Sequence, residues 1–261
     1  SGNSSVRWVR FCCVGDYCVM ECSVKDKTIV VTGAGQGIGN ELCRTLDQLG
    51  AKVIAVSRSS GPLEALKADC PRIETVQVDL SDWSATRTAL APLGKVDGLV
   101  NNAGVAVIKP FLELTEEDYD RTFAVNVKAA FNVAQILVPK MEAGASIVNV
   151  SSLAGLKAIH GHCAYSMSKA AIDGLTQNLA LELGPRKIRV NSVNPTVILT
   201  RMGRDNWSDP AKADPLKAKI PLGRFGEVSE VVEPIVYLLS DRSGFVNGHM
   251  LPIEGGFLAG N

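Results

Sequence analysis

The chain has 261 residues, which is enough for one large α/β domain or two small ones, and for a sizeable buried core. Its 27 Lys and Arg residues balance 27 Asp and Glu residues, so the net charge is zero. This balance gives no support for a nucleic-acid or membrane-surface partner, and no apolar run is long enough to span a membrane.

The N-terminal segment differs in composition from the rest of the chain. Residues 1–19 are polar and then cysteine-rich, and Arg7, Arg10 and Asp16 interrupt any apolar run, which makes a poor signal peptide. Met20 stands shortly before the first expected strand. We therefore interpret residues 1–19 as a cloning-derived or leader segment, with a genuine extension as the alternative.

The seven cysteines show no zinc-like spacing with histidine, so we expect no metal site. Four of them lie in the first 22 residues, and Cys43, Cys70 and Cys163 are scattered through the body. Scattered thiols are typical of reduced cysteines, which predicts a cytoplasmic protein.

Apolar strands and helical segments alternate from residue 28 onward. Strands are expected at 28–32, 51–56, 74–78, 96–100, 146–150, 189–193 and 250–253. Helices are expected at 38–49, 62–69, 82–91 after a Ser81 cap, 115–141, 164–183 and 227–239. Strands rich in Val and Ile without polar alternation are buried on both faces. The pattern predicts one α/β domain over residues 20–261, a Rossmann-type doubly wound parallel sheet of about seven strands with helices on both faces.

The alternation stops between residues 195 and 226. This stretch contains four prolines and Trp207. A long loop in a compact domain is usually functional or mobile, and this one follows a strand at the carboxyl edge of the sheet, where such folds bind ligands. We interpret residues 195–226 as a substrate lid.

A glycine turn joins the first strand to the first helix. Thr32 to Gly39 reads T-G-A-G-Q-G-I-G. Gly33 suits a tight turn, Gly37 lets backbone approach a pyrophosphate, and Gly39 permits close packing of helix on strand. The free N–H groups of the helix N-terminus would face the phosphate. A purely structural loop is the alternative, because a glycine cluster alone is not specific.

Tyr165 and Lys169 are four residues apart on an expected helix, so they share one face. A lysine ammonium beside a tyrosine lowers the phenol pKa, and the pair can then exchange a proton with a substrate oxygen. The same spacing is common on helix surfaces without any function.

Further polar residues stand where they could complete a site. Ser152 follows the fifth strand and could bond a substrate carbonyl, or cap the strand end. Asn101-Asn102-Ala103-Gly104 ends the fourth strand, beside the glycine turn in such a sheet. Asn126 lies in the middle of a long helix, where a helix irregularity, a water site or solvent exposure could each explain it.

These motifs together resemble the short-chain dehydrogenase/reductase family over residues 25–257. The glycine turn, N-N-A-G, Asn126, Ser152 and Y-x-x-x-K stand in family order and spacing. The resemblance implies hydride transfer between a nicotinamide and a carbonyl carbon, with Tyr165 as general acid or base. It implies that Lys169 lowers the pKa of Tyr165 and holds the nicotinamide ribose. Ser152 would orient the carbonyl, and Asn126 would hold a water of a proton relay.

Other stretches resemble those family members that reduce ketopentoses such as L-xylulose and α-dicarbonyls such as diacetyl. They are Val56-Ser57-Arg58, Val78-Asp79-Leu80, Asn194-Pro195-Thr196-Val197, Trp207-Ser208-Asp209-Pro210 and residues 251–256. The resemblance implies a small-molecule carbonyl substrate and a homotetramer. The cofactor contacts that it implies are Gly33, Gln36, Gly37, Ile38, Gly39, Ser57, Arg58, Asp79, Leu80, Asn101, Ala103, Gly104, Tyr165, Lys169, Pro195, Val197 and Thr200.

The end of the second strand indicates which cofactor is bound. An NAD site places an acid there, but this strand ends Val56-Ser57-Arg58, and an arginine can pair with the 2′-phosphate of NADPH. A solvated arginine is the alternative. Gln36 stands where many NADPH-binding relatives carry a basic residue, and losing one exposed charge contact costs on the order of 1 kcal/mol. We therefore predict NADPH, with a reduced preference over NADH.

His162 and Trp207 are the remaining substrate candidates, beside Ser152 and Tyr165. His162 could contact substrate hydroxyls or be an ordinary loop histidine, and Trp207 could close on the substrate or anchor the lid. Alternative functions are the reduction of another ketone, such as a 3-ketoacyl thioester or a steroid, and a non-catalytic scaffold that senses NADPH.

Overall fold

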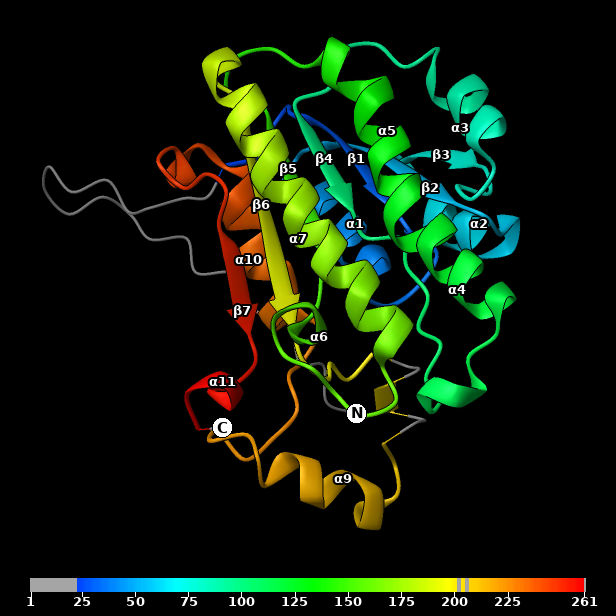
Figure 1. Ribbon diagram of the computed structural model, residues 1–261. Helices are drawn as coiled ribbons and strands as arrows, with labels where there is room; N and C mark the ends of the chain where they lie inside the picture. The colour runs from blue at the N-terminus through cyan, green and yellow to red at the C-terminus, as the bar shows by residue number, and fades with distance from the viewer. Residues whose placement is uncertain (1–22, 201–202, 205–206, 261) are drawn as a thin grey trace, which may run out of the picture.

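A seven-stranded, all-parallel sheet forms the centre of the computed structural model, which describes residues 23–200, 203–204 and 207–260 (Figure 1). The expected leader segment, residues 1–19, lies outside the described residues. The order across the sheet is β3-β2-β1-β4-β5-β6-β7, as the sequence predicts for a doubly wound fold. The strands are β1 (Thr28–Thr32), β2 (Lys52–Ser57), β3 (Glu74–Gln77), β4 (Gly98–Asn101), β5 (Ser146–Val150), β6 (Arg189–Pro195) and β7 (Met250–Ile253).

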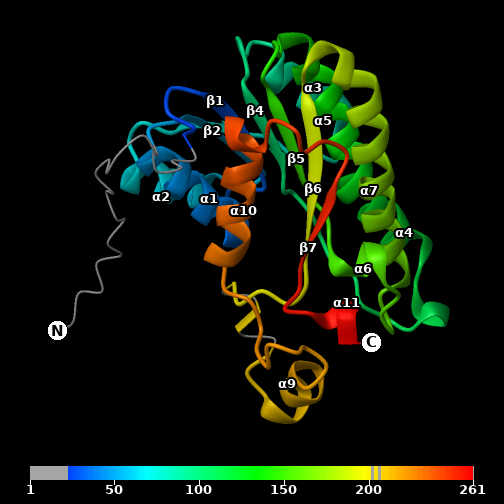
Figure 2. The same cartoon turned by 90° about the vertical axis from the view of Figure 1, so that its left-hand side faces the viewer.

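Helices cover both faces of this sheet (Figure 2). They are α1 (Gly37–Gln48), α2 (Ser60–Asp69), α3 (Trp83–Leu90), α4 (Glu116–Phe123), α5 (Ala129–Leu137), α6 (Leu153–Leu156), α7 (Cys163–Leu183), α9 (Pro210–Lys217), α10 (Ser229–Leu239) and α11 (Phe257–Gly260). Along β1, Ile29 and Val31 belong to the core under α1, α2 and α10, whereas Val30 belongs to the core under α3, α5 and α7. The apolar runs without polar alternation therefore indicate burial on both faces correctly in the inner strands. The prediction fails at the two edges of the sheet, where β3 is largely exposed and β7 is half-buried.

The chain changes direction across the sheet between β1 and β4. Strands β2 and β3 build outward from β1 on one side, and β5 to β7 build outward from β4 on the other. The helices that follow the strands on one side of this point therefore cover one face of the sheet, and those on the other side cover the opposite face. A crevice lies at the carboxyl ends of β1 and β4, where ligands bind in such sheets.

The helix expected over residues 115–141 is present as one unbroken helical stretch over residues 116–140, but it is not α-helical throughout. Helix α4 begins at the Thr115 capping box, a five-residue π turn over Ala124–Lys128 interrupts it, and α5 ends before a 3-10 turn at Val138–Lys140. The wide turn contains Asn126, so the helix irregularity considered from the sequence is present. A π turn of this kind often marks a functional position.

The cap expected at Ser81 is wrong by one residue. Asp82 is the N-cap of α3, and its carboxylate accepts a hydrogen bond from Ala85 N at 2.8 Å. The Ser81 hydroxyl donates to the Asp79 carboxylate at 2.7 Å instead. The two neighbouring side chains are both suitable caps, and the competing bond to Asp79 decides between them.

The region expected to be an irregular lid contains a helix. Helix α9 lies below the carboxyl ends of β6 and β7 in Figure 1. Beneath it is a separate apolar cluster of Leu153, Ala213, Ile220, Phe225 and Phe257. The prolines made this helix hard to predict. Pro210 is acceptable because it stands at the helix start, but Pro215 lies in the interior, where proline usually breaks a helix. The described part of residues 195–226 therefore contains one helix between irregular stretches, and part of it packs on this cluster.

No helix among the described residues has both the length and the apolar character needed to cross a bilayer.

The Asp82 cap gives a stability prediction. We expect Asp82→Ala to lower the free energy of unfolding by about 1 kcal/mol, because it removes the acceptor for the Ala85 N–H. Ser84→Ala, in the same exposed first turn, is the control and should change stability little. Urea unfolding followed by circular dichroism measures both, and equal losses in the two variants would refute the assignment of the cap.

Candidate active site

The glycine turn has the backbone that its sequence predicts. Gly33 and Gly37 have φ values of +66° and +56°, a region that residues with a side chain rarely adopt. A Cβ on Gly33 would lie 2.8 Å from Ala103 Cα, so the turn lies directly against the segment after β4. A Cβ on Gly39 would collide with the Gly33 carbonyl, which explains the close approach of α1 to β1.

The N-terminus of α1 is open to an anion. Its N-cap, Gln36, makes no side-chain hydrogen bond to the helix, and its first turn contains no acidic residue. Ile38 packs against the core, and Thr200 lies across the turn, with its Cγ2 3.2 Å from a Cβ placed on Gly37. The free backbone N–H groups of this helix N-terminus can bind a phosphate group, and Gly37 has no side chain to keep the phosphate away from them.

The segment after β4 is fixed to the glycine turn by Thr32 and Asn102. The Thr32 hydroxyl accepts hydrogen bonds from Asn102 N at 3.0 Å and Ala103 N at 3.1 Å. The Asn102 amide donates to the carbonyls of Thr32 and Gly33 at 3.0 and 3.2 Å. Sequence reasoning gave Asn102 no role, although its place in N-N-A-G beside the turn was the available signal.

Asn101 has a different environment from Asn102. Its Nδ2 donates to Asn149 Oδ1 at 2.9 Å, and its own Oδ1 is buried without a hydrogen-bond partner. Gly104 follows at an exposed position, where an added Cβ would lie 3.4 Å from Asn126 Oδ1 and 3.5 Å from Lys169 Nζ. The end of β4 therefore brings the cofactor candidates and the catalytic candidates together.

Ser57 ends β2 and Arg58 directly follows it, on the other side of the turn. A Cβ on Gly35 would lie 2.8 Å from Ser57 Oγ, and Arg58 is exposed. Hydrogen bonds from Ser81 hold the pKa of the Asp79 carboxyl below its usual value, and the Arg58 charge lowers it further. Leu80 beside it is buried. An open helix N-terminus with a nearby guanidinium fits a dinucleotide that carries an extra phosphate, so these residues fit NADP(H).

Helix α7 carries Tyr165 and Lys169 on one side, as their spacing predicts. Lys169 is 5% exposed, and its Nζ donates to the Val150 carbonyl at 2.8 Å. The same Nζ lies 5.6 Å from the centroid of the Tyr165 ring. Burial lowers the pKa of Lys169 to about 8, although the Asp173 carboxylate acts to raise it.

The lowered pKa expected for Tyr165 does not appear in this structure. Burial raises the pKa of its phenol, and a hydrogen bond with Ser152 lowers it. Burial has the larger effect in this structure, in which the Lys169 ammonium lies over the ring and bonds to Val150 rather than to the hydroxyl. Tyr165 is therefore held in its protonated form, as a general acid must be before it acts.

Ser152 lies beside Tyr165, and Asn126 bonds to the catalytic helix at Ser168. Ser152 accepts a hydrogen bond from Ala154 N at 3.1 Å, so it caps the start of α6 rather than the end of the strand. Asn126 accepts from Val105 N at 2.8 Å and donates to Ser168 Oγ at 2.9 Å. These bonds hold the π turn against α7 and the segment after β4. A water role for Asn126 remains a prediction.

The residues after β6 provide the other wall. Pro195 is buried at the strand end, and its carbonyl lies 3.5 Å from Ser152 Oγ. The Val197 carbonyl accepts from Gly226 N at 3.1 Å, and Thr200 Oγ1 accepts from Gly203 N at 3.0 Å. Pro195, Val197 and Thr200 thus follow one another from the catalytic side toward the glycine turn.

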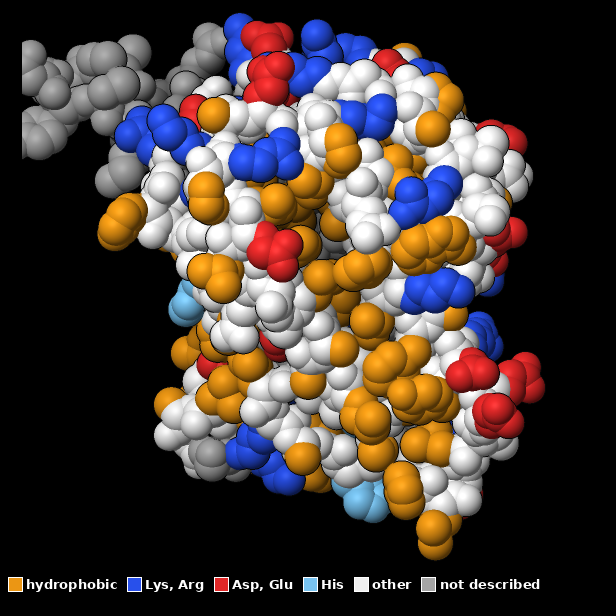
Figure 3. Space-filling view, turned by 45° about the horizontal axis from the view of Figure 1, so that its top comes forward, with side chains coloured by type: hydrophobic (Ala, Val, Ile, Leu, Met, Phe, Trp, Pro, Cys, Tyr) orange, Lys and Arg blue, Asp and Glu red, His pale blue; other side chains and the backbone are white. Residues whose placement is uncertain are grey.

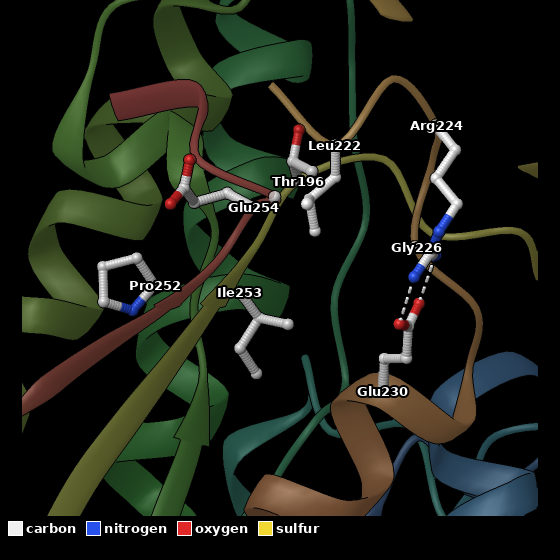
Figure 4. A pocket seen from close by; sticks show the side chains of 9 residues that line it. Thr196, Leu222, Arg224, Gly226, Glu230, Pro252, Ile253 and Glu254 are labelled. Atoms are coloured by element: carbon white, nitrogen blue, oxygen red, sulfur yellow. Dashed lines mark hydrogen bonds and ion pairs between the residues drawn. The ribbon is translucent and has the colours of Figure 1, made fainter. Parts of the chain in front are cut away.

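A cavity of about 250 Å³ is lined in part by Thr196 (Figure 4). Arg224 lies on one side of it and forms a two-pronged ion pair with Glu230 at 2.6 and 2.7 Å (Figure 4). Its lining includes Ile253 and Glu254 but none of Ser152, Tyr165 and Lys169. It is therefore separate from the candidate active site.

His162 and Trp207, the remaining substrate candidates, have different contacts. The His162 ring lies edge-on to Tyr165, with centroids 6.2 Å apart, and its Nδ1 is 2.7 Å from the His160 carbonyl. Trp207 packs on Phe225 at 5.3 Å between ring centroids, which places it against the lid cluster. The anchoring role considered for Trp207 has this direct contact, whereas its substrate role remains a prediction.

Among the described residues, no three or more His, Cys, Asp or Glu side chains converge as a metal ion would require.

Comparison with known proteins extends these findings. Residues 33–258 match a family model described as enoyl-(acyl carrier protein) reductase. The chain is 52% identical over 244 residues to L-xylulose reductase of Homo sapiens, covering 92% of this chain and 100% of the relative. It is 49% identical over 243 residues to carbonyl reductase (NADPH) 2 of Sus scrofa, covering 92% and 100%. A structure of gluconate 5-dehydrogenase from Burkholderia cenocepacia J2315 with NADP and tartrate has a TM-score of 0.86 at 28% identity, covering 91% and 97%.

The glycine turn gives a binding prediction. We expect Gly37→Ala to weaken NADPH binding by at least about tenfold, because a Cβ at φ +56° is strained and would occupy the approach to the helix N-terminus. Gly61→Ala is the matched control, since a Cβ there meets nothing within 4 Å. Titration of NADPH fluorescence measures both affinities. Unchanged binding by Gly37→Ala would exclude this turn as the phosphate site.

Proposed function

The chain belongs to the short-chain dehydrogenase/reductase family, and we propose that it reduces small carbonyl compounds with NADPH. The substrates proposed are ketopentoses such as L-xylulose, giving xylitol, and α-dicarbonyls such as diacetyl. The observation that carries this proposal is the convergence of Ser152, Tyr165 and Lys169, with Tyr165 held protonated by burial. The names of the relatives support the choice of substrates.

Tyr165 acts as the general acid of the proposed reaction. Ser152 bonds the substrate carbonyl oxygen and orients it toward the phenol. Bound NADPH supplies the hydride that the carbonyl carbon receives. As negative charge develops on the substrate oxygen, the Tyr165 hydroxyl gives its proton to that oxygen, and the charge passes to the phenolate. The nearby ammonium of Lys169 stabilises the phenolate. The attraction between the ammonium and the Tyr165 oxygen is therefore greatest after the proton has left and the oxygen carries negative charge.

The cofactor is proposed to lie along the crevice between the two halves of the sheet. The α1 N-terminus with Gly37 would hold the pyrophosphate, and Ser57 with Arg58 the 2′-phosphate. Asp79 and Leu80 would flank the adenine. The nicotinamide end would be held by Lys169 and by the other predicted contacts, Asn101, Ala103, Gly104, Pro195, Val197 and Thr200. The bound NADP in the Burkholderia structure supports this arrangement.

The substrate is proposed to bind under residues 195–226, which act as its lid. His162 can offer its Nε2 to a substrate hydroxyl, because its Nδ1 faces the His160 carbonyl. Asn126 would hold a water that returns a proton to the site after each turnover. Residues 20–261 would act as one dinucleotide-binding and catalytic domain.

We further propose that the enzyme assembles as a homotetramer in the cytoplasm. Hydrophobic side chains gather on the face that carries α4, α5 and α7 (Figure 3). Phe131 is 43% exposed, Met167 49% and Leu181 79%. Exposed apolar side chains on adjoining helices favour burial against another subunit. The free thiols of Cys43, Cys70 and Cys163 are compatible with a reducing compartment.

Arg58 provides a test of cofactor choice. We expect Arg58→Ala to lower kcat/KM for NADPH about tenfold and to leave kcat/KM for NADH nearly unchanged, because a charge-assisted bond to phosphate is lost. Lys52→Ala, at the opposite end of β2, is the charge-matched control. Equal losses with both cofactors would contradict a role for Arg58 in phosphate recognition.

Turnover provides the test of the reaction itself. We expect oxidation of NADPH with both L-xylulose and diacetyl, faster than with NADH at equal concentration. Tyr165→Phe should keep NADPH affinity and lower turnover by about 10²- to 10⁴-fold, because the ring stays and the proton is lost. Tyr237→Phe, an exposed tyrosine on α10, is the control.

The outcomes of this test separate the alternatives. Full activity of Tyr165→Phe would refute the general acid. NADPH binding without turnover of either compound would move the search to 3-ketoacyl thioesters and steroids. If those also fail, a non-catalytic NADPH-sensing scaffold would remain.

A further inference from the structure

A buried carboxylate lies on α7 one helical turn beyond Lys169. Asp173 is 7% exposed and has no place in the reaction described above. A buried charge is costly unless its partners compensate for the lost water. The groups that Asp173 contacts therefore indicate what it does.

Its two carboxylate oxygens bind side chains from β6. Oδ1 accepts from Ser192 Oγ at 3.0 Å, and Oδ2 accepts from Asn194 Nδ2 at 2.9 Å. Asn194 directly precedes Pro195, the buried end of the strand. Asp173 consequently fixes the last residues of β6 against the catalytic helix.

The same carboxylate is connected to the segment that carries Ser152. Asn194 Nδ2 also donates to the Ser152 carbonyl at 3.1 Å, and Ser151 Oγ donates to the Lys169 carbonyl at 3.1 Å. A Cβ on Gly155 of α6 would lie only 2.8 Å from Asp173 Oδ2. The carboxylate thus fills the junction of α6, α7 and the ends of β5 and β6.

Lys169 is the cation that responds to this carboxylate. Among the described groups, Asp173 is the charge that acts on Lys169, and Tyr165 is the titratable side chain over which its ammonium lies. The strands facing α7 present Ser151, Ser192 and Asn194 there, which carry no charge. On other neighbouring elements, Lys109 pairs with Asp118, and Lys157 lies over the Phe257 ring. Arg186 and Arg189 donate to backbone carbonyls. The remaining charged side chains of α4 and the π turn are exposed: Glu116, Glu117, Asp120, Arg121 and Lys128.

We propose that Asp173 is a positioning residue of the reaction, which keeps Lys169 charged and holds the segments of Ser152 and Pro195 at the spacing that the reaction uses. This inference rests on the proposed function. It assigns the two effects to one side chain, since the carboxylate whose charge acts on Lys169 is also the acceptor for Ser192 and Asn194.

The protonation equilibria agree with this assignment. Burial lowers the pKa of Lys169 to about 8, and the Asp173 carboxylate opposes that effect. Burial raises the pKa of Asp173, while hydrogen bonds from Ser151, Ser192 and Asn194 and the charge of Lys169 lower it. Lys169 loses its charge as pH rises through its pKa, so the rate of reduction should fall there. Without the charge of Asp173, this fall should occur at lower pH.

The test is the titration of Lys169 in the protein without cofactor. In Asp173→Asn, which keeps the shape of the side chain, we expect the midpoint of the Lys169 Nζ resonance to fall by about one pH unit. Glu182→Gln, exposed on the same helix, is the control and should leave the midpoint unchanged. In turnover, the alkaline limb of the kcat profile should move by the same amount.

A purely structural role predicts a different pattern. Asp173→Glu keeps the charge but crowds Gly155, so recovery of the Lys169 midpoint in this variant supports a charge role. Loss of activity in Asp173→Asn with an unmoved midpoint would overturn the proposal. Should the variants not fold, a protonated Asp173 carboxyl between pH 6 and 9 in the unaltered protein, observed by carbon NMR, would overturn it as well. Because the titration needs no substrate, a shifted midpoint without turnover would leave the charge role standing while the proposed reaction fails.

Discussion

The Thr32 hydroxyl fixes the two halves of the sheet to each other at the point where the strand order reverses. It accepts the N–H groups of Asn102 and Ala103, and it donates to the Val100 carbonyl at 3.3 Å. Both ends of this connection have functional consequences, because β1 continues into the glycine turn and β4 continues toward Asn126 and Lys169. The cofactor crevice and the proton-transfer group therefore share one rigid reference point in the core.

The architecture could be predicted because its signals are repeated along the chain. Runs such as Ile29-Val30-Val31 occur in nearly every strand, and burial on both faces requires apolar residues at each position. Features that depend on a single residue, such as a helix cap, were harder to predict. Ser81 and Asp82 are both suitable caps, and a bond to Asp79 outside the helix decides between them. Prolines concealed α9, because its stability comes from packing on Phe225 and its neighbours rather than from helix propensity.

The candidate site was predictable where spacing along one element determines proximity. Tyr165 and Lys169 share a face of α7 because four residues make about one helical turn. Asn102 and Asp173 could not be predicted in this way, because their hydrogen-bond partners lie on other strands. A single polar residue in the sequence does not show which distant residues it contacts. The direction of the Tyr165 pKa shift could not be predicted either. It depends on how much water the fold removes, and on where the Lys169 ammonium points.

Burial acts in opposite senses on the two members of the catalytic pair. It raises the pKa of the Tyr165 phenol and lowers that of the Lys169 ammonium, because it favours the neutral form of each. A phenol that stays protonated is ready to give its proton to a carbonyl oxygen, which is the direction of reduction. The ammonium must stay charged to stabilise the phenolate that remains. Desolvation thus keeps Tyr165 protonated, as the acid requires, but it also favours the neutral form of Lys169. The Asp173 carboxylate opposes this second effect by raising the pKa of Lys169.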